Sequence, residues 1–288
     1  MSQSVVFSLL LPASLVLIMF GLGLSLRIAD FAVAVLNPKP LIVALLCQVV
    51  LLPIVCFALV VVSGLSPALA MGMMLLAVSP GGSSAIIYTH LANGDTALSI
   101  TLNVVNTAIS LVTLPLVANF SMLYFYGSEV EIPLTLDKFA QLILLAALPA
   151  ALGIAFRNRR PSAAERLERP VKVFAIAFLV GVIFYAVVTQ FDVIVKWAPV
   201  VGLIGLIFNL CSLGVGYSIP MVFGLHPRQA IAIAMDIGVH NAAFVITLAM
   251  SEYFLNNAEM AVPPAIYALI AYVTASLAVV GYKRFKLV

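Results

Sequence analysis

One carboxylate lies deep inside an apolar stretch of this sequence. Asp236 has apolar neighbours on both sides, and His240 and Asn241 follow it closely. Burying a charged group within a membrane costs at least a few kcal/mol, so such a residue needs a partner. Two interpretations are open: a cation or proton site, or a structural Asp–His pair that holds helices together. If the segment is unwound, the backbone carbonyls of Ile237 and Val239 become available as additional cation ligands.

A second group of residues could bind an anion. Gly81 and Gly82 follow a proline and interrupt another apolar stretch, and Ser83 and Ser84 come directly after them. Free N–H groups at the start of a helix, together with the helix dipole, favour an anion. We therefore expect these four residues to bind the substrate, with Asn241 in the equivalent place at the second interruption.

The segment after the first interruption carries a stripe of polar residues. Ser99, Asn103, Asn106 and Ser110 are spaced by four, three and four positions and share one helix face. Such a stripe either lines an aqueous cavity or joins helices by hydrogen bonds. Its closeness in sequence to the first interruption favours the cavity, where we expect Asn106 to face the substrate. Gln48 is a lone amide in an earlier segment, and a lone amide is more often a contact between helices than a ligand.

These residues must be positioned by helices in a membrane. Hydrophobic residues make up 64% of the 288 positions and charged residues only 9%, whereas a soluble domain has about 25% charged residues. This composition excludes a soluble enzyme, a nucleic-acid binder and a disordered protein. We predict an all-α polytopic membrane protein, a single transmembrane domain over 1–288, with nine transmembrane helices. The predicted segments are approximately 5–26, 40–63, 67–92, 96–120, 136–156, 170–190, 198–222, 227–255 and 263–282, and the longest connections are 121–135 and 157–169.

Segments 67–92 and 227–255 are both interrupted near the middle, the first by Ser79 to Ser84 and the second by Asp236 to Asn241. Each half has about 12 residues, or roughly 18 Å of helix, which is too short for a hydrocarbon core of about 30 Å. A shift of 160 positions places Pro67 on Pro227 and aligns the two interruptions. The shift spans an odd number of segments, so the two copies have opposite orientations. Paired broken helices in an inverted repeat are typical of transporters with a midplane site; two unrelated kinks are the alternative.

The distribution of basic residues predicts an orientation. With the N-terminus outside, all but Lys138 and Lys196 of the 14 Lys and Arg residues fall on the cytoplasmic side. The positive-inside rule therefore places the C-terminus in the cytoplasm. We expect a multi-pass protein of a plasma (inner) membrane.

Together, and in order, several short motifs resemble those of the bile acid:sodium symporter family over nearly the whole chain. They are Met19 to Leu24, Asp30-Phe31, Pro38-Lys39, Gln48 to Pro53, Ser79 to Ser83, Leu91 to Asp95 with Ala97 to Ser99, Gly214 to Tyr217, and Asp236 to Asn241.

The resemblance implies panel and core domains that form inverted repeats, with two broken helices crossing in the core. Residues 5–63 and 170–222 would supply panel and core elements, and 67–120 and 227–282 the core-forming halves.

The resemblance also implies two sodium sites. One would use Asp236, His240, Gln48 and the carbonyls of Ile237 and Val239. His240 stands where the family has a glutamine, and imidazole is a poorer ligand than oxygen for hard Na⁺.

The second implied site would use Ser99 and Asn103 and share the acid of the first. Its remaining family positions fall on Ala85 and Ile86, which offer no side-chain oxygen. Proton coupling through a titratable His240 is therefore a serious alternative to sodium coupling.

We expect a secondary active transporter (symporter), not an enzyme, that carries a small organic anion such as a carboxylate or sulfonate. Na⁺ is the expected coupling ion and no other cofactor is expected. The alternative is an H⁺-coupled or ion-independent carrier or exporter on the same fold. A channel or sensor is less favoured, because the sequence has no pore-lining ring of like charges and no soluble output domain.

Overall fold

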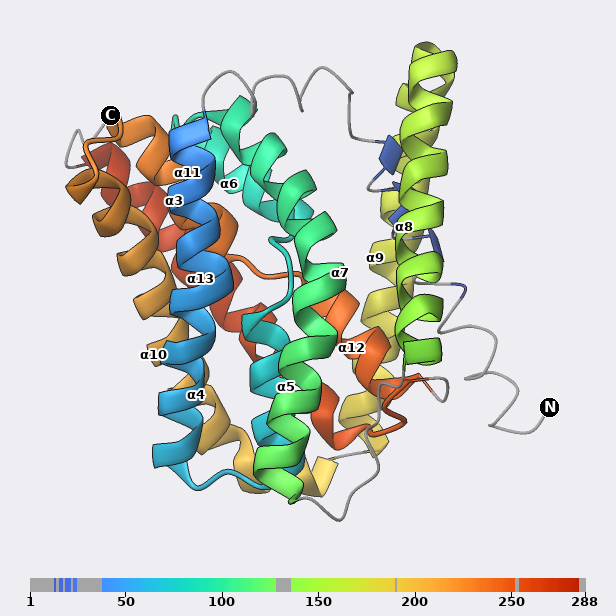
Figure 1. The fold of residues 1–288 in the computed structure, drawn as a ribbon, viewed down its shortest axis with the longest axis vertical. Coiled ribbons are helices and arrows are strands. Elements are labelled where there is room, and N and C mark those ends of the chain that lie inside the picture. Colours follow the sequence, from blue (N-terminus) through green and yellow to red (C-terminus); the bar gives the residue numbers. More distant parts are fainter. Residues whose placement is uncertain are drawn as a thin grey trace.

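The computed structural model describes residues 13, 16–17, 19–21, 23–24, 38–127, 136–189, 191–251 and 254–284. These residues are helical apart from short turns, and they form an elongated bundle (Figure 1). In chain order the elements are α3 (Pro38–Leu45), the π-helical turn η1 (Leu46–Leu51), α4 (Leu52–Ser63), α5 (Pro67–Ala77), α6 (Ser83–Leu91), α7 (Thr96–Tyr126), α8 (Leu136–Arg159), α9 (Pro161–Thr189), α10 (Phe191–Val222), α11 (Pro227–Gly238), α12 (Ala242–Met250), the 3-10 turn η2 (Glu259–Ala261) and α13 (Val262–Arg284). Most of the predicted segment 5–26 lies outside the described residues.

The outer surface of the bundle is that of a membrane protein. Among the described residues, four helical stretches are long and apolar enough to cross a bilayer: Pro38–Ser63, Thr96–Tyr126, Val195–Val222 and Glu259–Arg284. Large apolar side chains project outward from them, with exposed fractions of 88% for Val62 and 71% for Leu269. A soluble monomer rarely exposes so much contiguous apolar surface, so lipid is the natural environment of this face.

The predicted connections were wrong in two places. Residues 157–169 are helical except at Arg160, because α9 already begins at Pro161. Proline is favoured at the first position of a helix, and the Ala, Glu, Leu and Arg residues that follow it are strong helix formers. Helix α7 likewise continues to Tyr126 beyond the predicted end at 120.

The two predicted interruptions are present. The first separates α5 from α6, and the second separates α11 from α12. Figure 1 shows that α5 and α6 run upward in that view, whereas α11 and α12 run downward through the same central region. The broken helices therefore pass each other in opposite directions.

Both broken helices begin in the same way. Ser66 caps α5 by accepting a hydrogen bond from Leu69 N, and Pro67 takes the first helical position. His226 caps α11 in a reciprocal pair with Gln229, and Pro227 takes the first position there. These caps satisfy N–H groups that a helix start leaves unpaired, so the two starts are set by local sequence.

Helix α11 is held closely against α10. A Cβ atom at Gly216 would lie 2.6 Å from Ala234 Cα, and one at Gly238 would lie 2.5 Å from Leu213 Cδ2. Real Cβ atoms do not approach other heavy atoms so closely, so Gly216 must be glycine because it faces backbone, whereas a side chain at position 238 would require the Leu213 side chain to shift. The backbone of α11 therefore packs tightly against α10 through Ala234, Ile237 and Gly238, while Asp236 faces α7.

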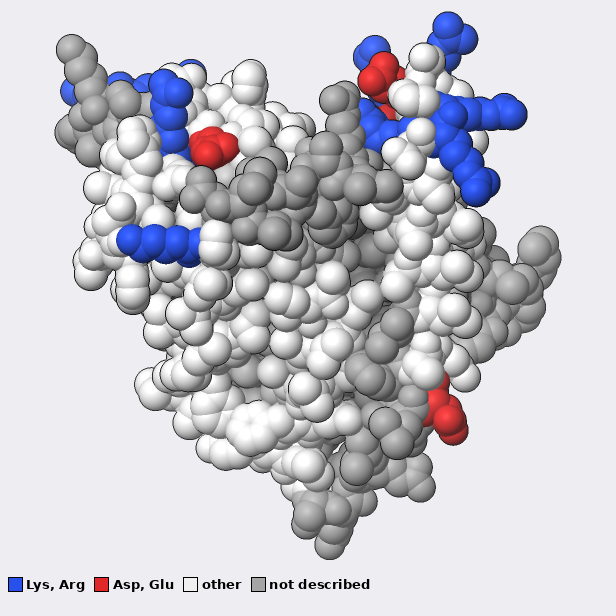
Figure 2. All heavy atoms as spheres, turned by 45° about the horizontal axis from the view of Figure 1, so that its top comes forward, with Lys and Arg blue, Asp and Glu red and all other residues white. Residues whose placement is uncertain are grey.

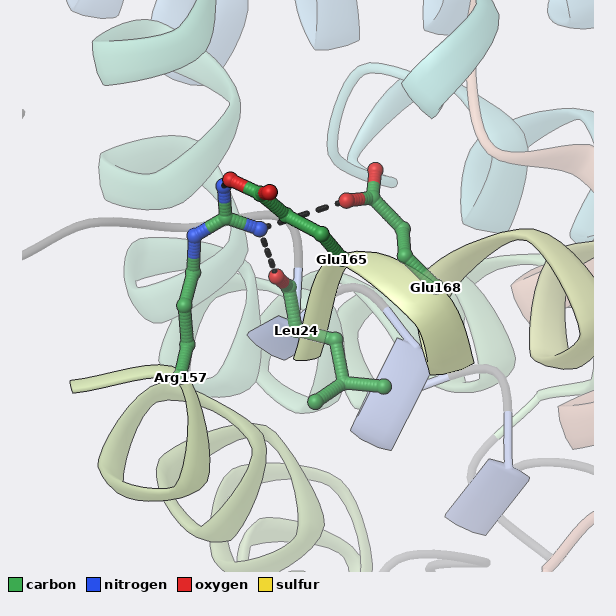
Figure 3. Close-up of polar contacts among 4 residues, drawn as sticks. All are labelled: Leu24, Arg157, Glu165 and Glu168. Carbon is green, nitrogen blue, oxygen red and sulfur yellow. Dashed lines mark hydrogen bonds and ion pairs between the residues drawn. The ribbon is translucent and has the colours of Figure 1, made fainter. Parts of the chain in front are cut away.

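Helices α8 and α9 lie on one side of the bundle with the described N-terminal residues (Figure 1). The buried Arg157 joins these three segments, as Figure 3 shows. Its Nη1 donates to Leu24 O and to Glu168 Oε2, the latter at 3.2 Å, and its Nη2 lies 3.8 Å from Glu165 Oε1. One guanidinium thus links the end of α8 to the start of α9 and to the N-terminal segment.

Charged side chains divide between the two ends of the bundle. Most exposed basic residues occupy the start of α3, the α8–α9 connection, the start of α11 and the end of α13, which share the upper end in Figure 1, and Lys196 near the start of α10 is an exception. Figure 2 shows two of these basic groups at the upper end of the molecule. The exposed acids Asp137 and Asp192 lie at the starts of α8 and α10, toward the opposite end.

Candidate functional site

The two interruptions meet as a short antiparallel backbone pair. Gly82 N donates to Val239 O at 2.6 Å, and Asn241 N donates to Pro80 O at 2.9 Å. Gly81 and His240 face each other in this bridge. The crossing satisfies backbone groups that lie too deep in the protein to reach water.

Asp236 lies beside this crossing but not inside the unwound stretch, where we expected it. Helix α11 continues through Gly238, because Val239 N still donates to Met235 O and closes its last turn. The carboxylate is fully buried. Its Oδ2 accepts a hydrogen bond from Asn106 Nδ2 at 2.6 Å. Its Oδ1 lies so close to Gly81 that a Cβ atom added there would be only 2.5 Å away.

The polar stripe of α7 faces the interior, and its middle residues contact the crossing. Ser99, Asn103, Asn106 and Ser110 are all buried. Asn103 Nδ2 donates to Gly81 O at 2.6 Å. Asn106 contacts Asp236 as described above, while Ser99 is more distant and accepts from Thr89 of α6 at 3.2 Å.

Gln48 and His240 meet at one carbonyl, that of Ser79. Gln48 lies in the π-helical turn η1, a deviation often found at functional sites. Its Nε2 donates to Ser79 O at 2.9 Å, and His240 Nδ1 approaches the same oxygen at 3.3 Å. A carbonyl can only accept, so this contact requires a proton on Nδ1, and in the neutral imidazole Nε2 is then an acceptor. The His240 ring also stacks on Phe208, with centroids 5.7 Å apart.

His240 and Asp236 therefore have different partners and do not form the structural pair considered from the sequence. Asp236 belongs with Asn103 and Asn106, and His240 belongs with Gln48 at Ser79.

Buried oxygens without a hydrogen-bond partner gather around the crossing. In each of the three amide side chains the NH₂ group donates, and the oxygen is left without a donor. The unpartnered acceptors are Gln48 Oε1, Asn103 Oδ1, Asn106 Oδ1, Asp236 Oδ1 and His240 Nε2. A small pocket beside the crossing has Gln48, Ser79, Pro80 and Asn106 among its lining residues. Buried polar atoms are rarely left unsatisfied. These acceptors therefore form a candidate site for a ligand that binds to oxygen atoms, such as a cation.

The expected anion-binding residues Gly81 to Ser84 lie at the start of α6, and Asn241 lies at the start of α12. Some of their polar groups already form hydrogen bonds within the protein. Gly82 N–H donates across the crossing, and the Asn241 side chain caps α12 by accepting from Phe244 N. Ser83 is exposed and Ser84 half-buried at the start of α6. The carbonyls expected as cation ligands are also partly used, since Val239 O accepts from Gly82 N.

The sequence did not single out a second polar cluster, at the end of α11. Asn209 of α10 and Tyr267 of α13 both donate to Gly238 O, at 2.7 and 2.8 Å. Thr274 Oγ1 lies 2.5 Å from Asn209 Oδ1, the shortest of its three possible hydrogen bonds, the others being to Ile270 O and Ala271 O. The repeat offered one signal, because the 160-position shift that aligns the interruptions places Gln48 one residue before Asn209.

Comparison with known proteins identifies the family of this chain. Residues 12–197 match the sodium bile acid symporter family, which is more than half of the 288 positions. The chain belongs to this family. The match confirms the resemblance found in the sequence and agrees with a membrane symporter family, not a family of enzymes.

Individual relatives include two cotransporters. The ileal sodium/bile acid cotransporter of Cricetulus griseus is 23% identical over 287 residues, covering 98% of this chain and 81% of that protein. Sodium/bile acid cotransporter 4 of Homo sapiens is 24% identical over 278 residues, covering 95% and 63%. The P3 protein of Mus musculus is 28% identical over 224 residues, covering 77% of this chain and 46% of that protein. The matched region thus spans about half the length of the P3 protein.

Proposed function

We propose that this chain is a secondary active transporter that carries a small organic anion together with Na⁺. The substrate class is a carboxylate or sulfonate, and transport proceeds by alternating access around the crossing of the broken helices. The names of two relatives, which describe sodium/bile acid cotransport, support both the ion and the substrate class.

The observation that carries the proposal is the set of unpartnered oxygens at the crossing. Asp236, Asn103 and Asn106 each present an oxygen without a donor next to the unwound backbone of Gly81. A carboxylate with neutral amide oxygens matches the preference of hard cations for oxygen ligands. A bound cation would also offset the cost of the buried negative charge. On these contacts Asn106 is better assigned to the cation than to the substrate.

The proposed transport movement takes place between two groups of helices, the panel and the core. Helices α8 and α9 with the N-terminal segment form the panel, and the other helices form the core. The Arg157 contacts hold the panel together at one end. The opposite directions of α5–α6 and α11–α12 support the inverted repeat, and the start of α6 near Ser83 and Ser84 is the proposed place for the anion.

Ion-gradient experiments test the coupling. Purified protein in proteoliposomes should accumulate bile acids or smaller carboxylates and sulfonates when Na⁺ is outside, and should not do so when choline replaces Na⁺. His240→Gln should preserve or strengthen this Na⁺ dependence, because a glutamine can donate to Ser79 O and still present an oxygen to the ion.

Proton coupling is the second candidate, and the unpartnered Nε2 of His240 favours it. In that case uptake should follow an imposed pH gradient without Na⁺, and His240→Gln should remove the response. Uptake that responds to neither gradient would contradict both forms of the proposal.

The charge distribution supports a cytoplasmic C-terminus, and cysteine labelling tests it. A cysteine at the exposed Ser162, near the basic end, should react with an impermeant thiol reagent only from the cytoplasmic side. A cysteine at the exposed Asp192 should react only from outside. Both cysteines are introduced on a Cys211→Ser background, which is also the control, since Cys211 is partly exposed whereas Cys47 and Cys56 are buried. The reverse labelling pattern would refute the orientation.

A further inference from the structure

The two interruptions are held by corresponding hydrogen bonds, but the amide oxygens around them differ in whether they have a donor. At each interruption, an amide from the preceding helix donates to a carbonyl at the end of the first half-helix or just after it: Gln48 to Ser79 O, and Asn209 to Gly238 O. Around the first interruption Gln48 Oε1, Asn103 Oδ1 and Asn106 Oδ1 lack donors. At the second, the oxygen of Asn209 accepts from Thr274 Oγ1.

The cluster at the second interruption is closed on itself. Asn209 Nδ2 donates to Gly238 O at 2.7 Å and lies 2.9 Å from Tyr267 Oη, and Tyr267 Oη donates to Gly238 O at 2.8 Å. All three side chains are buried, and none of their polar atoms is among the unpartnered ones. A polar network with every group satisfied rigidifies the backbone that it contacts and leaves no group free for a ligand.

The Gly238 carbonyl, to which Asn209 and Tyr267 donate, lies between Asp236 and His240 along the chain. Gly238 is two residues after Asp236 and two before His240. The Tyr267 ring is 5.6 Å from the His240 ring and 5.9 Å from the Phe208 ring, on which His240 stacks. The Leu213 side chain packs closely on Gly238, since a Cβ atom added there would lie 2.5 Å from Leu213 Cδ2. The cluster therefore fixes the end of α11, and through it the Asp236 carboxylate.

We infer that Asn209, Tyr267 and Thr274 are positioning residues that set the cation affinity of the site by clamping the Gly238 carbonyl. The inference rests on the proposed cation coupling. These residues do not contact the cation themselves, and they act by holding Asp236 at the distance from Asn106 that binding requires.

Substitutions that remove single hydroxyl groups test the clamp. In proteoliposomes, Tyr267→Phe keeps the ring and removes the donor to Gly238 O. Thr274→Val removes the donor to Asn209 Oδ1. Each should raise the half-saturating Na⁺ concentration roughly three- to tenfold, because that ratio corresponds to the net free energy that one hydrogen bond contributes. The maximal rate, and the KM for the organic anion at saturating Na⁺, should stay near wild type.

Two matched variants serve as controls. Thr274→Ser retains the hydroxyl and should restore the wild-type Na⁺ response. Tyr88→Phe removes a similar tyrosine–carbonyl bond, from Tyr88 Oη to Tyr272 O, at an exposed position away from the crossing, and should leave the Na⁺ response unchanged.

The outcomes separate the hypotheses. If Tyr267→Phe and Thr274→Val lower thermal stability and maximal rate together, with the half-saturating Na⁺ concentration unchanged, the cluster is only structural and the inference is overturned. Wild-type behaviour of both variants overturns it as well, while Na⁺-driven uptake by the parent protein leaves the proposed function standing. A parent protein indifferent to Na⁺ overturns the proposed coupling and this inference together.

Discussion

Asp236→Asn should reduce Na⁺-driven accumulation of the organic anion to background. The substitution keeps the size of the side chain and removes its charge. The amide oxygen of the new residue can still accept from Asn106 Nδ2, which lies 2.6 Å from Asp236 Oδ2. The protein should therefore fold, whereas the only charged ligand proposed for the cation is lost. Exchange of substrate already inside the vesicles can survive, because exchange does not require a net movement of the ion.

Uptake into proteoliposomes with an inward Na⁺ gradient measures this effect, with thermal denaturation as a check on folding. Asp95→Asn is the matched control. Asp95 caps α7 by accepting from Leu98 N at 3.0 Å, and asparagine is an equally good cap. Its uptake should equal that of the parent protein. An Asp236→Asn variant that still concentrates substrate would show that the carboxylate is not part of the coupling site.

The features that could be predicted from the sequence are those set by local patterns. Unbroken apolar segments predicted a helical membrane protein. Proline at 67 and 227, followed about a dozen positions later by polar residues, predicted the two interruptions. The spacing of Ser99, Asn103, Asn106 and Ser110 predicted one buried face of α7, which the structure confirms.

The features that could not be predicted depend on contacts between distant segments. Asp236 binds Asn106, which is 130 positions away, and Thr274 binds Asn209, which is 65 positions away. A lone amide such as Asn209 in an apolar helix looks the same in sequence whether it binds a ligand or a carbonyl. The end of α11 was also placed too early, because a polar side chain inside the membrane does not by itself unwind a helix whose backbone bonds remain satisfied.

Gly81→Ala should be almost as damaging as loss of the carboxylate. A Cβ atom at this position would lie 2.5 Å from Asp236 Oδ1 and 2.8 Å from Asp236 O. The carboxylate cannot move away without breaking its bond to Asn106, and the backbone cannot move without opening the bridge between Gly81 and His240. Overpacking of an interior costs roughly 1–3 kcal/mol. Because the clash is with a proposed cation ligand, we expect this free energy to weaken Na⁺ binding. It corresponds to a roughly 5- to 150-fold loss of Na⁺ affinity.

Two further alanine variants calibrate this result. At Gly82 the added Cβ would lie 3.2 Å from His240 O and Val239 O, so Gly82→Ala should have a milder effect. At Gly202, in α10, a Cβ meets nothing within 4 Å, so Gly202→Ala should leave Na⁺-driven uptake unchanged. The expected order of uptake is Gly202→Ala, then Gly82→Ala, then Gly81→Ala. Because all three variants add the same methyl group, differences among them report the space at each position. Wild-type uptake by Gly81→Ala would show that the two backbones can separate at the crossing without disturbing the site.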